Sequence, residues 1–413
     1  MGNAADQTTH RKLALARQRL PNVCDSGHAL IVSRYYDDVA VAMAVIMRSL
    51  LSRFNPESFT LVTRHVPDAK LRYEGATDYR MREIPKFLPS RFSDLWVRLQ
   101  TPFAVSRVKR MARRRGVKVI LATHVDMQAI TIARKTARAL KLPWAVYIHN
   151  MIVENYRDTK HNHRARRLQA KVFSEASSVL VMCGGIADLY LERYGFASKT
   201  LVHNHAEPVP VELPTRSVLP QGLLAGAIYE INARSAKRVL DALTVLDLPM
   251  VITTRQPEKD LQRFGITGPN VKREFYAERA DYLNALERQS VLVVALDWPD
   301  ESPESGDELA TLLPTRVVEY LASGRPVLVH CPERCFTARF LRQHACALVV
   351  SERSVSALAS AIKRVMADGE DIRKMRRAGL ETVRTVFAVE RVAAEFKAEM
   401  DALSKLTWCQ KLR

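Results

Sequence analysis

The sequence contains no apolar run long enough to cross a membrane and no apolar core typical of a secretory signal. A membrane helix needs about 20 consecutive apolar residues, and no run in the 413-residue chain approaches that length. Residues 1–26 are instead polar and mildly basic. We therefore expect a cytoplasmic protein with a polar N-terminal tail.

Cysteine is scarce, and the usual metal-binding spacings are absent. The six cysteines are scattered without a C-x-x-C pair, so neither a disulfide framework nor a structural zinc site is expected. No D-x-D occurs, and His161 and His163 in KHNHRARR have no third ligand spaced with them. We predict buried thiols, no bound metal and no cofactor.

Three common catalytic or nucleotide-binding motifs are also missing. The chain has no G-x-G-x-x-G, no P-loop and no G-x-S-x-G. These absences argue against a standard dinucleotide enzyme, a P-loop NTPase and an α/β-hydrolase.

Basic residues are abundant, but they are unevenly distributed along the chain. Residues 1–210 hold 34 Lys and Arg against 17 Asp and Glu, a net charge of +17, whereas residues 211–413 hold 29 against 27. The run RVKRMARRRG (107–116) is at the centre of the most basic stretch. We expect the first half to present a surface for an anionic partner, with nucleic acid, phospholipid and an anionic glycan or lipid phosphate as candidates.

Apolar strand-like runs alternate with helical stretches in both halves. The first half contains ALIVS (29–33), FTLVT (59–63), VKVILAT (117–123), WAVYIH (144–149) and SVLVM (178–182). The second half contains GLLAGAI (222–228), PMVITT (249–254), VLVVAL (291–296), PVLVH (326–330) and ALVVS (347–351). Continuous apolar strands are typical of parallel sheets covered on both faces, so we predict an α/β protein with two doubly wound, Rossmann-like domains facing a cleft.

A proline-rich segment separates the two sets of strands. We predict a tail at 1–26, an N-terminal domain at 27–205, a linker at 206–221 and a C-terminal domain at 222–385. The last part, 386–413, is expected to be a helix that packs back toward the N-terminal domain. Open α/β sheets bind ligands beyond the carboxyl ends of their strands, so a ligand site is expected there.

The stretch PTRVVEYLASGRPVLVH (314–330) predicts a helix, a stop at Gly324 and a buried strand. Glu319 lies on the face of this helix opposite its apolar stripe. One interpretation is a surface ion pair with Arg316, which would contribute only about 0.3 kcal/mol to stability. The other interpretation is a ligand contact.

The same stretch, followed by CALVVSERSVSALASAIKRVMAD and MRRAGLETVRTVFAVERVAAEF, resembles the C-terminal half of the group 1, or family 4, GT-B glycosyltransferases. The resemblance covers about residues 222–400. The first half resembles the acceptor domain of that family more loosely, through SRYYDD, YIHN and VLVMCGGIADLYLERYG.

The resemblance implies roles for particular residues. Glu319 would accept hydrogen bonds from the ribose hydroxyls of a nucleotide-sugar, and the helix start at Thr315 and Arg316 would face the diphosphate. Arg255, after the strand VITT, would supply a further cation to the donor. His149, at the end of WAVYIH, would lie near the reactive carbon, although a structural hydrogen bond is an equal alternative.

Gly184 and Gly185 follow another strand and open the next helix. They could present amides to a ligand, or they could serve only a tight turn.

Three features depart from the pattern of that family. Thr311 stands where the first glutamate of E-x7-E is expected, the glycine pair after the first strand is replaced by YYDDVAVA, and GAIYEINARSAK lacks a Lys-Gly pair. An active but divergent transferase and one that has lost activity both agree with these departures.

We therefore predict a metal-independent, retaining glycosyltransferase that moves a sugar from a nucleotide-sugar to a surface-polysaccharide or lipid-linked acceptor. The alternatives are a catalytically silent GT-B-like binding protein and a basic nucleic-acid-binding protein, the latter disfavoured because no recognition motif occurs. We expect no nucleic-acid partner.

Residues 90–115, SRFSDLWVRLQTPFAVSRVKRMARRR, combine apolar and arginine-rich positions. We interpret them as two short helices broken at Thr101 and Pro102. Either the apolar members cover the sheet, or the segment lies on an anionic membrane surface. We favour the second interpretation, which would place the protein peripherally on the inner face of the membrane.

Overall fold

The computed structural model describes residues 20–34, 36, 42–64, 79–81, 90–124, 126–154, 159–215, 218–302 and 306–406. The predicted tail up to residue 19 and most of the SRYYDD stretch lie outside the described residues, and so does Cys409.

A seven-stranded sheet contains the strands of the first half, in the order β3-β2-β1-β4-β5-β6-β7. Its strands are β1 (His28–Val32), β2 (Phe59–Arg64), β3 (Tyr79–Met81), β4 (Val117–His124), β5 (Trp144–Ile148), β6 (Ser178–Val181) and β7 (Lys199–Thr200). The pairings whose register is defined are parallel, for example Ala29 opposite Phe59 and Val119. Apart from the exposed Lys118, all residues of the central strands β4 and β5 are buried, as their largely apolar sequences predict.

Helices alternate with these strands. They are α2 (Ala42–Leu51), a short 3₁₀ turn (Pro56–Ser58), α3 (Ser90–Arg114), α4 (Met127–Leu140), α5 (Thr159–Glu175) and α6 (Gly184–Tyr194). Asp126 caps α4 by accepting hydrogen bonds from the amides of Gln128 and Ala129 at 3.1 and 3.3 Å.

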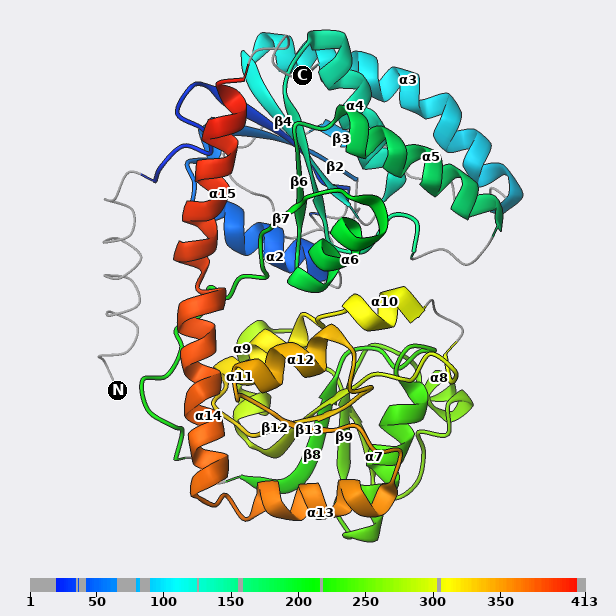
Figure 1. Ribbon diagram of the computed structural model, residues 1–413, viewed down its shortest axis with the longest axis vertical. Coiled ribbons are helices and arrows are strands. Elements are labelled where there is room, and N and C mark those ends of the chain that lie inside the picture. Colours follow the sequence, from blue (N-terminus) through cyan, green and yellow to red (C-terminus); the bar gives the residue numbers. More distant parts are fainter. Residues whose placement is uncertain are drawn as a thin grey trace. The chain divides into compact units, whose positions relative to one another are not determined.

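A second, six-stranded sheet has the order β10-β9-β8-β11-β12-β13, and its paired strands are parallel. Its strands are β8 (Leu219–Ala225), β9 (Met250–Thr253), β10 (Val271–Glu274), β11 (Gln289–Ala295), β12 (Val327–His330) and β13 (Leu348–Val350). Both predicted sheets are thus present, and the predicted α/β class is confirmed (Figure 1).

The helices of the second half complete this alternation. They are α7 (Ala233–Val245), α8 (Glu258–Arg263), α9 (Arg279–Glu287), α10 (Gly306–Thr311), α11 (Arg316–Ala322), α12 (Phe336–Gln343), α13 (Val355–Met366) and α14 (Glu370–Thr382). A π-helical turn (Val383–Phe387) then leads into α15 (Val389–Ser404).

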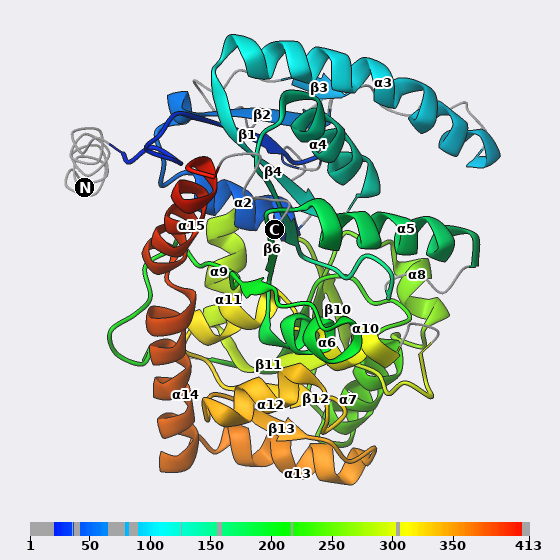
Figure 2. The same ribbon diagram turned by 45° about the horizontal axis from the view of Figure 1, so that its top comes forward.

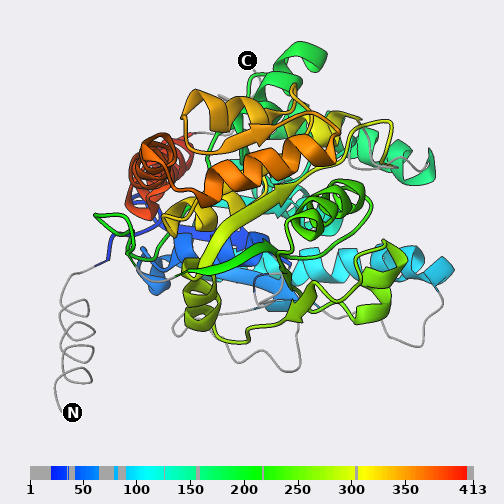
Figure 3. The same cartoon turned by 90° about the horizontal axis from the view of Figure 1, so that it is seen from below.

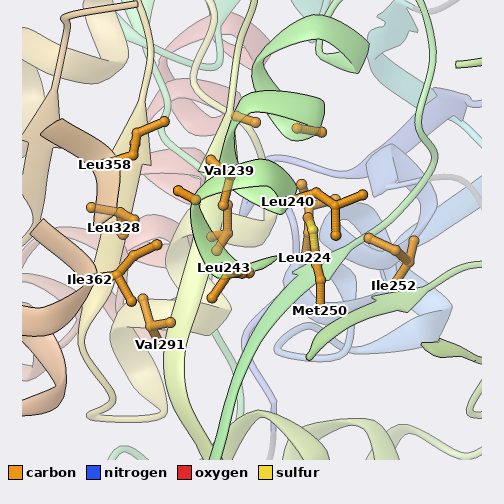
Figure 4. Packing of buried hydrophobic residues seen from close by; sticks show 14 of the residues in the cluster. Leu224, Val239, Leu240, Leu243, Met250, Ile252, Val291, Leu328, Leu358 and Ile362 are labelled. Carbon is orange, nitrogen blue, oxygen red and sulfur yellow. The ribbon is translucent and has the colours of Figure 1, made fainter. Parts of the chain in front are cut away.

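The core of the second sheet lies between its strands and two helices. Helices α7 and α13 pack against each other over one face of the sheet (Figure 3). Leu243 of α7, Val291 of β11 and Ile362 of α13 are completely buried and point toward one another (Figure 4). Burying such a side chain stabilises the fold by about 1.5–3 kcal/mol, so this layer holds the strand ends in place.

The chain forms two compact units. One contains the described residues of Met1–Tyr147, Ser174–Val179 and Ala393–Arg413, and the other contains those of Ile148–Phe173 and Leu180–Val392. The domain limits given above remain predictions.

The prediction of two short helices in residues 90–115 is wrong. These residues form the single helix α3, with Pro102 inside it (Figure 2). Proline removes one amide donor from the helix, and the hydroxyl of Thr101, which donates to the carbonyl of Val97 at 2.6 Å, does not replace it. Packing of α3 against α4 and β4 offsets the remaining cost. Among the described helices, none is long and apolar enough to span a bilayer.

Candidate functional site

The stretch that carries Glu319 folds as predicted. Helix α11 ends at Ala322. Gly324, two residues later, has a φ of +64°, the left-handed conformation that favours glycine, and the buried strand β12 follows. Glu319 is on the less buried face of α11, opposite Val317 and Leu321.

Helix α11 is tied to the carboxyl end of β8 through a single residue of that strand. The amide of Ala225 donates to the hydroxyl of the buried Tyr320 at 2.6 Å. The carbonyl of the same Ala225 accepts from Nη1 of Arg316. Gly226 then turns the chain with a φ of +95°, and a Cβ there would lie 3.5 Å from the guanidinium of Arg316. Arg316 therefore lies at the sheet edge where open α/β folds bind ligands.

Both carboxylate oxygens of Glu319 accept hydrogen bonds from α9. Nη1 of Arg279 donates to Oε1 at 2.6 Å, and the hydroxyl of Tyr282 donates to Oε2 at 2.9 Å. The side chain of Glu319 is 15 % exposed. Glu319 pairs with Arg279, and Arg316 donates to a backbone carbonyl. The structure therefore does not contain a surface ion pair between Arg316 and Glu319.

Arg279 also contacts a second carboxylate. Its Nε donates to Oε1 of Glu207, and Oε2 of Glu207 lies 3.6 Å from Nδ1 of His205. Burial opposes ionisation of Glu207, but the hydrogen bond and charge of Arg279 hold its pKa below the ordinary value. Burial lowers the pKa of His205 despite both nearby carboxylates.

This cluster holds Glu319 in one orientation without using its full accepting capacity. An ionised carboxylate offers about four lone-pair sites, and Arg279 and Tyr282 use two of them. Two of its acceptor sites are therefore not taken by these two donors. Burial and the nearby Glu319 charge raise the pKa of Tyr282, so its hydroxyl stays protonated and donates.

Sequence reasoning missed Arg279, Tyr282 and Glu207. Arg279 and Tyr282 precede Glu319 by 40 and 37 residues, and Glu207 precedes Arg279 by 72. No local spacing signals contacts of this kind, because they arise only when the strands are assembled into a sheet.

The other residues predicted to bind the nucleotide-sugar donor also lie near the carboxyl ends of the strands of the second sheet. Thr315 is the residue that precedes α11, and its side chain makes no capping hydrogen bond. Arg255 follows β9, and its guanidinium lies 4.8 Å from the ring centroid of Phe275, the residue after β10. The ring can thus hold the exposed guanidinium by a cation–π contact.

Two acidic residues between β11 and α10, Asp297 and Glu301, make a helix cap and an ion pair. Asp297 accepts from the amides of Arg234 and Ser235 at the start of α7, at 3.1 and 2.7 Å. Glu301 binds Arg238 with both oxygens, at 2.7 and 2.9 Å. Asp297 thus caps α7, and the charge of Glu301 is paired with Arg238.

Thr311 is buried at the end of α10. Its hydroxyl donates to the carbonyl of Asp307 at 2.9 Å, and its carbonyl accepts from Sγ of Cys183 at 3.1 Å. No carboxylate is present at this position to receive a sugar hydroxyl.

Gly184 and Gly185 differ in their surroundings. A Cβ on Gly185 would lie 2.8 Å from both the carbonyl oxygen of Thr311 and the side chain of Phe336, whereas one on Gly184 would lie 3.3 Å from Phe336. Close packing is thus a sufficient reason for glycine at 185, and a ligand-facing role for the pair remains a proposal.

His149 follows β5 and is 3 % exposed. The predicted donor-binding residues lie on α11, just before it or after β9, among the elements of the second sheet. His149 and the glycine pair follow strands of the first sheet.

The described cysteines Cys24, Cys183, Cys331, Cys335 and Cys346 are buried and free, as predicted. Burial raises the pKa of the Cys183 thiol to about 12, so it stays protonated. In the part of the chain that the structure describes, no group of three or more His, Cys, Asp and Glu is arranged to hold a metal ion.

Several solved structures share this architecture. Sucrose-phosphate synthase from Thermosynechococcus elongatus is 16 % identical, with a TM-score of 0.64 over 91 % of this chain and 99 % of that one. HepE from Anabaena, in complex with UDP and glucose, is 13 % identical, with a TM-score of 0.65 over 92 % of this chain and 100 % of that one. A glycosyltransferase from Rickettsia africae is 11 % identical, with a TM-score of 0.63 over 92 % and 100 %.

The chain has the GT-B fold. At these identities the similarity establishes the fold, so the activity has to be argued from the site. No protein-family model and no curated protein sequence matches the chain.

Proposed function

We propose that the protein is a glycosyltransferase that moves a sugar from a nucleotide-sugar donor to a surface-polysaccharide or lipid-linked acceptor. The observation that carries this proposal is the Glu319 carboxylate at the ligand-binding edge of the second sheet. Arg279 and Tyr282 orient it, and two of its acceptor sites can still be used.

In this proposal, Glu319 accepts hydrogen bonds from the two ribose hydroxyls of the donor. A carboxylate suits this task because charge-assisted hydrogen bonds are roughly twice as strong as neutral ones. Arg316 and the backbone at Thr315 would face the diphosphate, and Arg255 would supply a second guanidinium. His149 would lie near the reacting carbon of the sugar.

Catalysis would then rest on positioning and on stabilisation of the departing nucleoside diphosphate. Arg316 and Arg255 would neutralise the negative charge that develops on the leaving group, without a metal ion bound by D-x-D. We propose retention of the anomeric configuration, as the resemblance implies.

The UDP and UDP-glucose complexes of HepE make uridine nucleotide-sugars the first donors to test. A lipid-linked acceptor would bring the protein to a membrane surface.

A second candidate is a GT-B-like binding protein without catalytic activity. Thr311 favours it, because this residue is 5 % exposed and its hydroxyl is bonded to the α10 backbone, where the related transferases have a glutamate toward the donor sugar. Such a protein would bind the nucleotide through Glu319 without turning over the sugar.

A ligand-stabilisation screen of the full chain with UDP-, GDP- and ADP-sugars tests both candidates. A ligand at 100 times its Kd adds about 2.7 kcal/mol of apparent stability, which shifts the thermal midpoint measurably. We expect at least one nucleotide-sugar to stabilise the protein and to be slowly hydrolysed by it.

Stabilisation without any hydrolysis or transfer would favour the silent binding protein. If no nucleotide-sugar shifts the thermal midpoint and none is hydrolysed, both candidates are wrong.

A further inference from the structure

Helix α3 has one face packed on its own unit and one face turned outward. Thr101, Ala104, Val108 and Ala112 are at most 6 % exposed and recur at helical spacing. This face packs on α4 and β4, and α4 lies beside α3 in Figure 2.

The opposite face begins with a row of large apolar side chains. Leu95, Leu99 and Phe103 are 51, 57 and 78 % exposed, and each lies four positions after the one before it. Side chains at this spacing lie on the same side of an α-helix. Three exposed large apolar side chains in a row do not stabilise an isolated soluble domain.

The same face continues with arginines toward the end of the helix. Arg107, Arg110 and Arg114 are exposed and lie in the same angular sector as the apolar row. Between residues 95 and 116 the chain has seven Lys and Arg and no Asp or Glu. The outward face of α3 is therefore divided along its length into an apolar half and a cationic half.

We propose that this outer face, formed by Leu95, Leu99, Phe103, Arg107, Arg110 and Arg114, docks on an anionic phospholipid bilayer. The apolar half spans about 12 Å of helix and would enter the boundary between headgroups and acyl chains. The arginine half would lie on the phosphates of the headgroups.

A bilayer matches both halves of the face, whereas other anionic partners match only one. Free phosphate or nucleic acid would pair with the arginines but would leave Leu99 and Phe103 in water. A wholly apolar partner would not offer counter-charges to Arg110 and Arg114.

Docking on a bilayer would use residues of α3 alone and needs no nucleotide-sugar. It goes beyond the proposed transferase activity, and its test does not depend on turnover. A protein that docks without transferring sugar, or transfers sugar without docking, would separate the two proposals.

The experiment is co-sedimentation of the full chain with vesicles of phosphatidylcholine alone or mixed with phosphatidylglycerol, across a salt series. We expect binding to the anionic vesicles only, weakening as salt rises. Arg110→Gln/Arg114→Gln should weaken binding about 25-fold, because each cationic side chain near an anionic leaflet contributes about fivefold. Leu99→Gln/Phe103→Gln should weaken it at every salt concentration.

Two matched variants serve as controls. Lys363→Gln/Lys374→Gln removes two exposed positive charges from α13 and α14, and Leu191→Gln/Val245→Gln removes two exposed apolar side chains from α6 and α7. Both should bind vesicles like the unmodified chain.

Three results would overturn the proposal. The first is that the chain does not bind anionic vesicles at low salt. The second is that the α3 variants and the control variants lose vesicle binding equally. The third is that the chain binds duplex DNA or single-stranded RNA through Arg110 and Arg114 but does not bind vesicles. All substituted side chains are exposed on helices, so we expect every variant to fold. The thermal midpoint of each variant checks this.

Discussion

At the scale of the residue, Glu319 is defined by its partners on α9. Arg279 and Tyr282 fix its two oxygens at 2.6 and 2.9 Å, and Glu207 shares Arg279 with it. A carboxylate on an otherwise polar helix face is thus oriented before any ligand arrives, and preorganisation of this kind lowers the entropic cost of binding.

Glu319→Gln should weaken binding of UDP or of the best nucleotide-sugar while the fold is kept. Glutamine has the same size but no charge, so the loss of a charged ligand hydrogen bond should cost about 1.5–3 kcal/mol, or roughly 10- to 150-fold in Kd. Isothermal titration calorimetry measures this directly.

The control for this substitution is Glu352→Gln, an exposed glutamate in the loop before α13. It should leave the nucleotide affinity unchanged. An unchanged Kd in Glu319→Gln as well would assign Glu319 a purely structural ion pair with Arg279.

His149→Ala should reduce kcat more than it raises the KM for the donor. A group at the reacting centre acts in the transition state, so its removal lowers turnover while ground-state binding is largely kept. Steady-state kinetics with a donor found in the screen gives both constants.

His163→Ala, which alters an exposed histidine on α5, is the matched control and should change neither constant. If His149→Ala lowers the thermal midpoint but turns over normally, the buried His149 serves packing alone.

At the scale of the element, α6 begins with two glycines that have different constraints. A Cβ on Gly185 would clash with the Thr311 carbonyl and with Phe336. A Cβ on Gly184 would be close only to Phe336, and a small shift of that ring would make room for it. The start of α6 therefore requires a residue without a side chain at position 185.

Gly185→Ala should destabilise the protein by roughly 1–3 kcal/mol, the usual cost of overpacking, and Gly184→Ala should cost less. Urea unfolding of the two variants measures the difference. Shortening Phe336 in Gly185→Ala/Phe336→Ala should not restore the stability, since the Thr311 carbonyl and the Cβ of residue 336 stay in place and the packing of the ring is lost. Equal stabilities for the two single variants would contradict this packing.

At the scale of the whole molecule, buried neutral histidines tie stability to pH. Burial lowers the pKa of His203 and of His330 from 6.5 to about 4, and Arg238 beside His330 adds to the effect. Arg238 donates to Nε2 of His330 at 3.0 Å, so Nδ1 carries the proton and donates to the Val350 carbonyl.

Stability should be full above about pH 6.5 and should fall as the pH drops toward 4. Between these pH values the two histidines bind protons in the unfolded chain but not in the folded one. Each can therefore lower the free energy of unfolding by a value on the order of 3 kcal/mol. Unfolding by urea at pH 7 and pH 4.5 measures the change.

His203→Leu isolates one of these contributions. Within the described residues, Nδ1 of His203 has no hydrogen-bond partner and Nε2 meets only the Met182 sulfur, so leucine should keep the stability at pH 7. The loss at pH 4.5 should become smaller, while the exposed His163→Leu changes nothing. An unaltered loss in His203→Leu would show that His203 is not the titrating group.

The sequence alone predicted the α/β class, ten of the strands and the helix that carries Glu319. These features depend on apolar runs and on Gly324, which act locally. The three strands it missed, β3, β7 and β10, are edges of their sheets. An edge strand is covered on fewer sides, and short polar segments such as VKRE therefore suffice.

Tertiary structure decided the rest. It made α3 one helix in spite of Pro102, because packing on α4 and β4 outweighs a single missing amide. It also paired Glu319 with Arg279 and Tyr282 rather than with Arg316. Helical spacing specifies only neighbours within one turn, whereas the carboxyl ends of parallel strands bring together residues that are about 40 positions apart in the chain.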